Sequence, residues 1–136
     1  MLDLQFICEN RDLVIDNCRK RGVTADVDAV IRLRDERNAL IAKGDEMRRQ
    51  QKEVSAQIPK ASPGDRPKLV EQGKTLRELV NHTEEQQKVI EEQLRLEQIL
   101  VPNMTHPEAP IGGEDDAKEI TVWGNKPKFD FKPKDH

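Results

Sequence analysis

The stretch that decides the fold is residues 26–58, DVDAVIRLRDERNALIAKGDEMRRQQKEVSAQI. Seam residues recur in it at alternating steps of three and four, which is typical of a coiled coil. At about 1.5 Å per residue, the stretch predicts one helix about 50 Å long. The seam is weakened where it holds arginine, glycine or glutamine. Its positions are Val30, Leu33, Arg37, Leu40, Gly44, Met47, Gln51, Val54 and Ile58.

A second stretch, residues 67–101, has the same spacing and predicts a second long helix. Pro59, Pro63 and Gly64 separate the two, and Pro67 suits the first turn of the second helix. Two helices of similar length joined by a short turn run antiparallel. The second seam consists of Leu69, Gly73, Leu76, Val80, Thr83, Gln87, Ile90, Leu94, Glu97 and Val101.

The predicted fold class is all-α: a long antiparallel two-helix coiled-coil hairpin on a small helical base, with an irregular C-terminal connector. We expect the base at 1–25, where Asn10 caps a helix that ends near Gly22. The arm follows at 26–101 with its turn at 59–66. The connector, 102–136, is rich in proline and glycine, and we expect one short strand in it, at Ile120, Val122 and Trp123.

The composition of the chain excludes several classes of function. The chain has 136 residues, of which 36% are charged and 3% aromatic, with no aromatic between residues 7 and 122. No apolar run approaches the roughly 20 residues of a membrane span, and no signal segment opens the chain, so we expect a cytoplasmic protein. We expect Cys8 and Cys18 to be packed thiols and not metal ligands. No nucleophile, base and oxyanion donor can be assembled, so we expect no catalytic residue, no metal site and no catalysis by this chain alone.

Charge is polarised along the predicted hairpin. The distal half, 43–77, holds nine lysines and arginines and five acids, for a net charge of +4. The proximal remainder, 26–42 and 78–101, holds five basic and ten acidic residues, for a net charge of −5. A cationic tip suits a polyanion such as a phosphate backbone. The alternative is an ordinary solvated face without a ligand.

Heptad positions place Arg48 and Arg77 nearly opposite each other, on one edge of the hairpin. We expect both to be unneutralised, with Arg49 and Lys52 extending the patch, and Arg34 to face Glu91 nearer the base. Proteins that bind single strands stack bases on aromatic side chains, which this arm lacks. The predicted ligand is therefore a duplex gripped by backbone and shape.

Short groups of residues at both ends of the chain form a recognisable pattern. They are Met1-Leu2-Asp3, Phe6-Ile7, Glu9-Asn10, Arg21-Gly22, Val101-Pro102-Asn103, His106-Pro107, Pro110, Gly112, Trp123-Gly124, Phe131, Pro133-Lys134 and His136. In their order and spacing the chain resembles the N-terminal part of bacterial-type seryl-tRNA synthetase over nearly its whole length. Cys8 departs from this pattern, because the family often has arginine there, and the family's class II catalytic motifs are absent.

The resemblance implies an arm that projects from a class II core and reaches the long variable arm and elbow of serine tRNA. It implies that the full-length protein is an ATP-dependent serine–tRNA ligase, dimeric through its core, with ATP and Mg²⁺ bound only by that core. Serine tRNA is the implied partner, with no DNA and no membrane. The residues carried over by position are Arg48, Arg49, Lys52, Lys74 and Arg77, with Lys43, Lys60, Arg66 and Lys68 as secondary candidates.

Two alternatives stay open. The chain could be an excised domain of the ligase or a stand-alone relative of the family. It could also be a coiled-coil adaptor that binds another protein, because Gly44, Gln51, Gly73 and Thr83 leave gaps in the seam that a further helix would cover.

Overall fold

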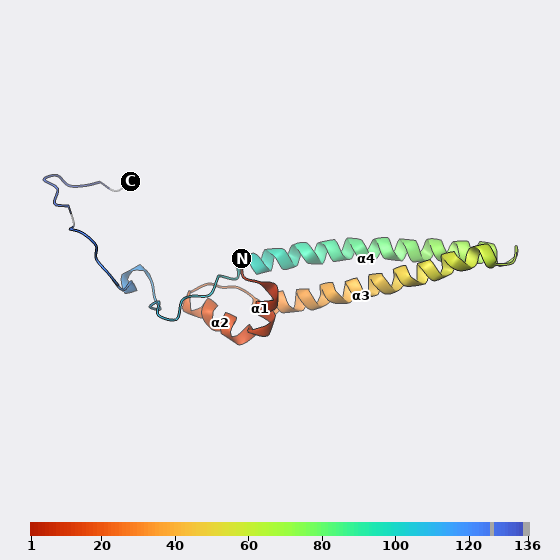
Figure 1. The fold of residues 1–136 in the computed structure, drawn as a ribbon, viewed down its shortest axis with the longest axis horizontal. Helices are drawn as coiled ribbons and strands as arrows, with labels where there is room; N and C mark the ends of the chain where they lie inside the picture. The colour runs from red at the N-terminus through yellow and green to blue at the C-terminus, as the bar shows by residue number, and fades with distance from the viewer. Residues whose placement is uncertain (126, 135–136) are drawn as a thin grey trace. The chain divides into compact units, whose positions relative to one another are not determined.

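The computed structural model describes residues 1–125 and 127–134, so Lys126, Asp135 and His136, the last of the residues in the family resemblance, lie outside it. The chain divides into two compact units, Met1–Thr105 and the segment that begins at His106. All regular structure in the described residues is helical (Figure 1). No described helix has the length and apolar character needed to cross a bilayer.

The first unit contains the predicted hairpin. Helix α3, Val27–Gln57, and helix α4, Arg66–Leu100, lie side by side along their length (Figure 1). A short 3-10 helix, Ile58–Lys60, begins the turn between them. Asp26 caps α3 by accepting from the Ala29 amide at 2.8 Å, and Pro67 stands in the first turn of α4, where its missing N–H costs nothing. The prediction of an all-α antiparallel hairpin is confirmed.

The helical base consists of two short helices where the sequence pointed to one. Helix α1, Leu4–Glu9, is capped by Asp3, which accepts from the Phe6 amide at 2.9 Å. Helix α2, Arg11–Lys20, starts after Asn10 and is followed by Gly22, whose φ of 63° lies in the left-handed region. Asn10 caps no amide of α2 through its side chain.

The core of the first unit lies where the base meets the arm. Ile7, Val14 and Val30 are fully buried there, and they are joined by Leu94 of α4 and by Val101, the residue that follows α4. Cys18 belongs to this core, and burial raises the pKa of its thiol, which keeps it protonated. Further along the arm only the seam is buried, because a two-helix hairpin has a single apolar face to cover.

Two buried side-chain amides connect the N-terminal residues and the segment that follows α4 to this core. The Asn17 side chain donates to the Asn103 carbonyl at 3.3 Å and accepts from the Thr105 amide at 2.9 Å. Gln98 near the end of α4 donates to the Leu2 carbonyl at 2.8 Å. The segment that leaves α4 is therefore held against α2 by specific hydrogen bonds as far as Thr105.

The described part of the second unit contains a 3-10 turn, Glu114–Asp116, and a contact between Phe129 and Phe131 with ring centroids 5.2 Å apart. The predicted short strand is wrong. Residues Ile120, Val122 and Trp123 form no ladder in the described part of the chain, and Trp123 is 97% exposed. A strand needs a neighbouring strand to take up its backbone hydrogen bonds, and β-branched residues alone do not supply one.

Candidate nucleic-acid interface

The distal cations are arranged by the register of the two long helices. A Cβ added at Gly44 would lie 3.8 Å from the Thr83 methyl group, and one at Gly73 would lie 3.9 Å from a Val54 methyl group. These contacts set residue 44 level with 83 and residue 54 level with 73. Position 48 then lies level with position 79, close to Arg77, so the predicted register is nearly correct.

The side chain of Arg48 nevertheless turns to a different partner. Its guanidinium donates across the seam to Glu84 at 2.7 Å and within α3 to Asp45 at 2.7 Å. Helical side chains lean toward the N-terminus of their own helix. In antiparallel helices this brings Arg48 and Glu84 toward each other, over Gly44 and Thr83. The expectation of an unneutralised Arg48 beside Arg77 is therefore wrong.

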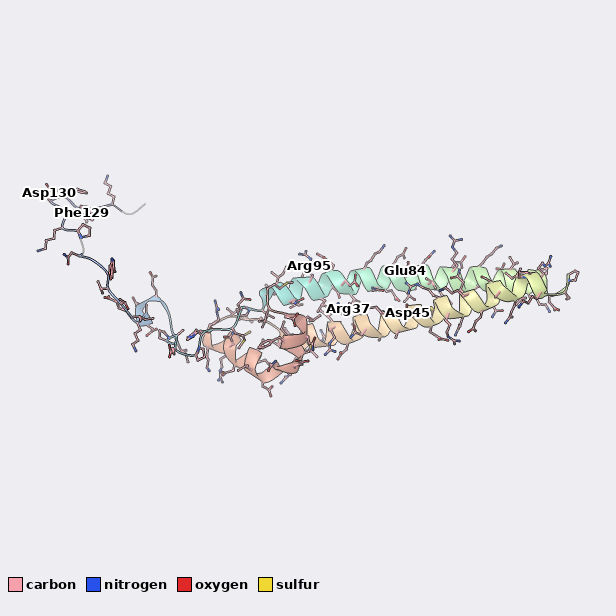
Figure 2. The ribbon with its side chains drawn as sticks, viewed as in Figure 1. Arg37, Asp45, Glu84, Arg95, Phe129 and Asp130 are labelled. Carbon is pink, nitrogen blue, oxygen red and sulfur yellow. The ribbon has the colours of Figure 1, made fainter. Side chains whose placement is uncertain are left out.

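Ion pairing also engages Arg49. This residue donates to Glu46 at 2.7 Å and to Glu53 at 2.6 Å along the outer face of α3. The hydrogen bonds from Arg49 and then Gln50 lower the pKa of the Glu46 carboxyl to about 2, and the pKa of Arg49 is raised, chiefly by its hydrogen bond to Glu46. The hydrogen bond from Arg48 to Glu84 likewise raises the pKa of that guanidinium. Figure 2 shows Asp45 and Glu84 on the facing helices of the arm.

The other predicted cations are less engaged. Lys74 has Glu71 at 3.7 Å, a long and exposed pair. Among residues 1–125 and 127–134, the remaining candidates have no carboxylate oxygen within 4 Å. They are Lys43 and Lys52 on α3, Lys60 in the 3-10 turn, and Arg66, Lys68 and Arg77 on α4.

Heptad positions put four candidates, Arg48, Lys52, Lys74 and Arg77, on one edge of the hairpin, which we call the cationic edge. Its three members other than Arg48 lie nearer the tip, beyond the Arg48–Glu84 pair. Exposed ion pairs contribute only about 0–1 kcal/mol each, so a phosphate can replace the carboxylates that hold Arg48 and Arg49. Pairing leaves the net charge of the distal half at +4.

Sequence reasoning missed Glu84 as a partner for Arg48. Glu84 and Arg77 occupy the same heptad position one repeat apart, so the spacing alone allowed either pairing. The expected pair of Arg34 with Glu91 is also wrong. Asp35 lies 3.2 Å from the Arg34 side chain, and Glu91 accepts from Gln87 at 2.9 Å.

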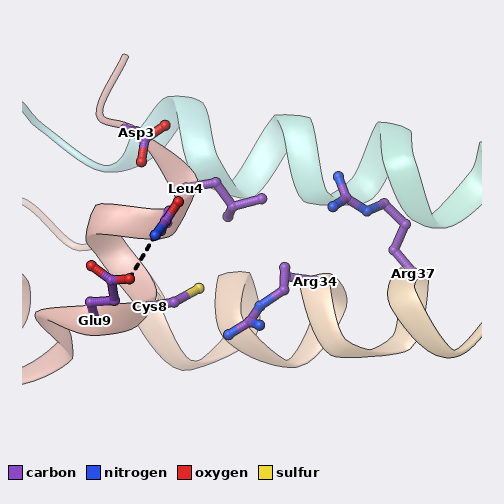
Figure 3. A pocket seen from close by; sticks show the side chains of 7 residues that line it. Asp3, Leu4, Cys8, Glu9, Arg34 and Arg37 are labelled. Carbon is purple, nitrogen blue, oxygen red and sulfur yellow. Dashed lines mark hydrogen bonds between the residues drawn. The ribbon is translucent and has the colours of Figure 1, made fainter.

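A pocket of about 590 Å³ opens between α1 and the base of α3. Arg34 and Arg37 line it from α3, and Asp3, Cys8 and Glu9 line it from α1 and its cap (Figure 3). Glu9 accepts a hydrogen bond from the Gln5 side chain at 2.7 Å, and Asp3 accepts one from the Phe6 amide as the cap of α1. Both carboxylates therefore already have hydrogen-bond donors. Two positive and two negative groups cancel, and this pocket therefore lacks the charge excess that a polyanion needs.

Comparison with known proteins shows the family of this chain. Residues 1–105 match the family described as the seryl-tRNA synthetase N-terminal domain. The chain belongs to that family. It is 45% identical over 138 residues to a serine–tRNA ligase of Rubrobacter xylanophilus, 44% to one of Rhodopirellula baltica and 41% to one of Treponema denticola. Each alignment covers all of this chain.

The seryl-tRNA synthetase N-terminal domain is a part of those ligases. The chain spans about a third of their length, 32% of the first two and 33% of the third. It therefore corresponds to their N-terminal domain and not to the whole enzyme, as the resemblance implied. The hairpin, the base and the buried Asn17 bonds all fall inside the matched residues 1–105.

Proposed function

We propose that this domain is the tRNA-binding arm of a serine–tRNA ligase, and that it holds serine tRNA by its backbone and shape. The observation that carries the proposal is the excess of cations on the distal hairpin, where six candidates have no carboxylate within 4 Å among the described residues. Relatives at 45% and 44% identity that are serine–tRNA ligases support the choice of RNA.

The chemistry of the arm suits a folded RNA with double-helical arms. Lysine and arginine contacts to phosphates release counterions and carry little sequence information. The arm has no aromatic side chain on which an unpaired base would stack. An arm of this length can follow the ridge of an RNA helix, so we propose the long variable arm and elbow of serine tRNA as the surface bound.

For the full-length protein we propose aminoacylation by a class II core that binds ATP and Mg²⁺ and forms the homodimer, working in the cytoplasm. Residues 1–25 would then be the base, 26–101 the arm and 102–136 the connector to that core. The role of this chain is to position the tRNA, and we assign no catalytic residue, no DNA partner and no membrane partner to it.

The test compares two lysines at the same heptad position of α4. Lys74 lies in the distal half and Lys88 fourteen residues nearer the base. We expect Lys74→Ala combined with Arg77→Ala to weaken binding of serine tRNA to residues 1–136. We also expect it to lower the magnitude of the slope of log K against log salt by about 2, for two lost phosphate contacts.

Lys88→Ala is the matched control and should leave the slope unchanged within about 0.3. Fluorescence anisotropy across a salt titration measures both, with helix content checked by circular dichroism. Equal slopes for the wild type and the distal double variant would refute the assignment of the cationic edge.

A further inference from the structure

Helix α4 reverses its charge along its length. Its first part, residues 66–77, holds four lysines and arginines and one acid, for a net charge of +3. The remainder, residues 78–100, holds six glutamates and two basic residues, for a net charge of −4. We call this second part the acidic stretch. The neighbouring part of α3, residues 27–42, has three acids and three arginines, so it leaves the negative charge of the acidic stretch uncompensated.

The order of the charges does not stabilise the helix. The dipole of an α-helix favours acidic residues in the first turn and basic residues in the last turn. In α4 the first turn contains Arg66 and Lys68 and no acid, and the last turn contains Glu97 and no base. The positive end of the dipole therefore adds to the cations at the tip, and the negative end adds to the acidic stretch. This arrangement points to a role outside the helix.

Ion pairing does not remove the negative charge of the acidic stretch. Glu84 pairs with Arg48 at 2.7 Å, and Glu92 pairs with Arg95 at 2.8 Å. Lys88 has no carboxylate oxygen within 4 Å in residues 1–125 and 127–134, and four glutamates have no lysine or arginine nitrogen within that distance. These glutamates are Glu78, Glu85, Glu91 and Glu97.

Three of the four free carboxylates lie on the side of α4 that carries the cationic edge. Glu91 occupies the same heptad position as Arg77, two repeats nearer the base. Glu78 and Glu85 occupy the neighbouring outer position, and both are exposed. An RNA helix that followed the cationic edge toward the base would meet these carboxylates. Among the described residues of the acidic stretch, Lys88 is the one unpaired cation that would offset them.

The two parts of α4 act on RNA separately. Arg77, the last cation of the first part, lies 23 residues before Leu100, which is about 35 Å along the helix. At physiological salt, charges interact over only about 8 Å. RNA placed against the acidic stretch is therefore repelled by the nearest carboxylates and gains no attraction from the cations at the tip.

We propose that the acidic stretch is a specificity determinant, which lowers the affinity for RNA that contacts the arm only near its base. The inference rests on the proposed function, because it concerns the same RNA-binding arm. The carboxylates bind no ligand, and their repulsion disfavours RNA in the wrong place. The arm then accepts RNA whose double-helical arm projects as far as Arg77, which is the role proposed above for the long variable arm of serine tRNA.

The test measures discrimination between two RNAs. One is a serine tRNA transcript, and the other is the same transcript with its long variable arm cut to a short loop. Residues 1–136 should bind the intact transcript more tightly. Glu78→Gln with Glu85→Gln should tighten binding of the shortened transcript at least threefold and of the intact transcript less than twofold. The ratio of the two Kd values, measured by fluorescence anisotropy at low salt, should therefore fall.

Glu108→Gln with Glu114→Gln is the matched control. It removes the same charge from the second unit, and neither residue has an ion pair among the described residues. This variant should leave the ratio of the two Kd values as it is in the wild type. An unchanged ratio in the Glu78 and Glu85 variant would overturn the inference, and so would an equal fall of the ratio in both double variants.

This outcome is distinguishable from failure of the proposed function. The proposed function fails if Lys74→Ala with Arg77→Ala leaves the salt slope unchanged. The selective role alone fails if that slope falls as expected and the ratio of Kd values does not respond to Glu78→Gln with Glu85→Gln. Helix content should be the same in the wild type and this glutamine variant, because both glutamates are exposed and glutamine suits a helix as well as glutamate.

Discussion

Arg48 of α3 and Glu84 of α4 form a hydrogen-bonded ion pair across the seam, with a nitrogen–oxygen distance of 2.7 Å. The same guanidinium holds Asp45 at 2.7 Å, so one cation joins the two helices and also braces its own. The pair marks the place on the arm where the acidic proximal part gives way to the cationic distal part. RNA that reaches this far toward the base has to compete with two carboxylates for Arg48.

Glu84→Gln should free Arg48 for an external phosphate. Because an exposed pair contributes about 0–1 kcal/mol, we expect the free energy of unfolding to fall by less than about 1 kcal/mol. The affinity for serine tRNA should rise by up to about fivefold, the factor that corresponds to about 1 kcal/mol. Urea unfolding and fluorescence anisotropy measure the two effects.

Glu91→Gln is the matched control for that experiment. Glu91 occupies the same heptad position one repeat closer to the base and, among the described residues, accepts a side-chain hydrogen bond from Gln87 alone. The Glu91→Gln substitution removes the same charge as Glu84→Gln without releasing an arginine, so its effect on tRNA affinity should be smaller. Identical gains from the two variants would mean that overall charge, and not the release of Arg48, decides the affinity.

Gly44→Ala should stabilise the arm. A glycine inside a helix costs about 1 kcal/mol relative to alanine. The added Cβ would meet the Arg48 guanidinium at 3.7 Å and the Thr83 methyl group at 3.8 Å, which are ordinary contacts. We expect the free energy of unfolding to rise by about 1 kcal/mol, as measured by urea unfolding followed by circular dichroism.

Gly22→Ala gives the opposite expectation from the same chemical change. Its φ of 63° is left-handed, so a Cβ there strains the backbone by about 1–2 kcal/mol although nothing lies within 4 Å of it. The free energy of unfolding should therefore fall. If both glycine variants shifted stability in the same direction, backbone conformation would not be the controlling factor.

The ion pairs of α3 predict how stability depends on pH. The pKa of Glu46 is about 2 in the folded chain, below the model-peptide value of 4.5. A carboxyl whose pKa is depressed by folding stabilises the folded state above the unfolded pKa and loses that contribution as pH falls through the folded pKa. Stability should therefore decline between about pH 4.5 and pH 2.

Glu46→Gln should flatten part of that decline, because the group that binds the proton is gone. Thermal unfolding from pH 7 to pH 2 measures the effect. Glu97→Gln, a carboxylate of α4 that has no ion pair among the described residues, is the control and should leave the curve unchanged in shape. Parallel curves for wild type and Glu46→Gln would show that the pair of Arg49 with Glu46 does not form in solution.

The sequence specified the hairpin because its seam spacing persists through both helices and is interrupted only by prolines and glycine at the turn. Arg37, Gly44 and Gln51 did not break the first helix, since each is compatible with helical backbone and its neighbours in the seam are apolar. Helix α1, the first of the two helices of the base, was not predicted. Its signal was Asp3, three residues before Phe6, a cap followed by only six helical residues.

The candidate site was harder to predict than the fold. Heptad positions correctly placed Arg48 and Arg77 on the same edge, but the partner of Arg48 depends on which way its long side chain leans. Spacing defines where a Cα lies, whereas the choice between Arg77 and Glu84 is made by side-chain direction and charge. The strand expected at Ile120 failed for a related reason, because β-propensity is fulfilled only when a neighbouring strand is present.

The hydrogen bonds of Asn17 to Asn103 and Thr105 have a consequence for evolution and engineering. They hold the segment that follows α4 against α2, so the last residues of the first unit are fixed by hydrogen bonds within that unit. We therefore expect residues 1–105 to fold unchanged when they are exchanged between members of the family at the junction after Thr105.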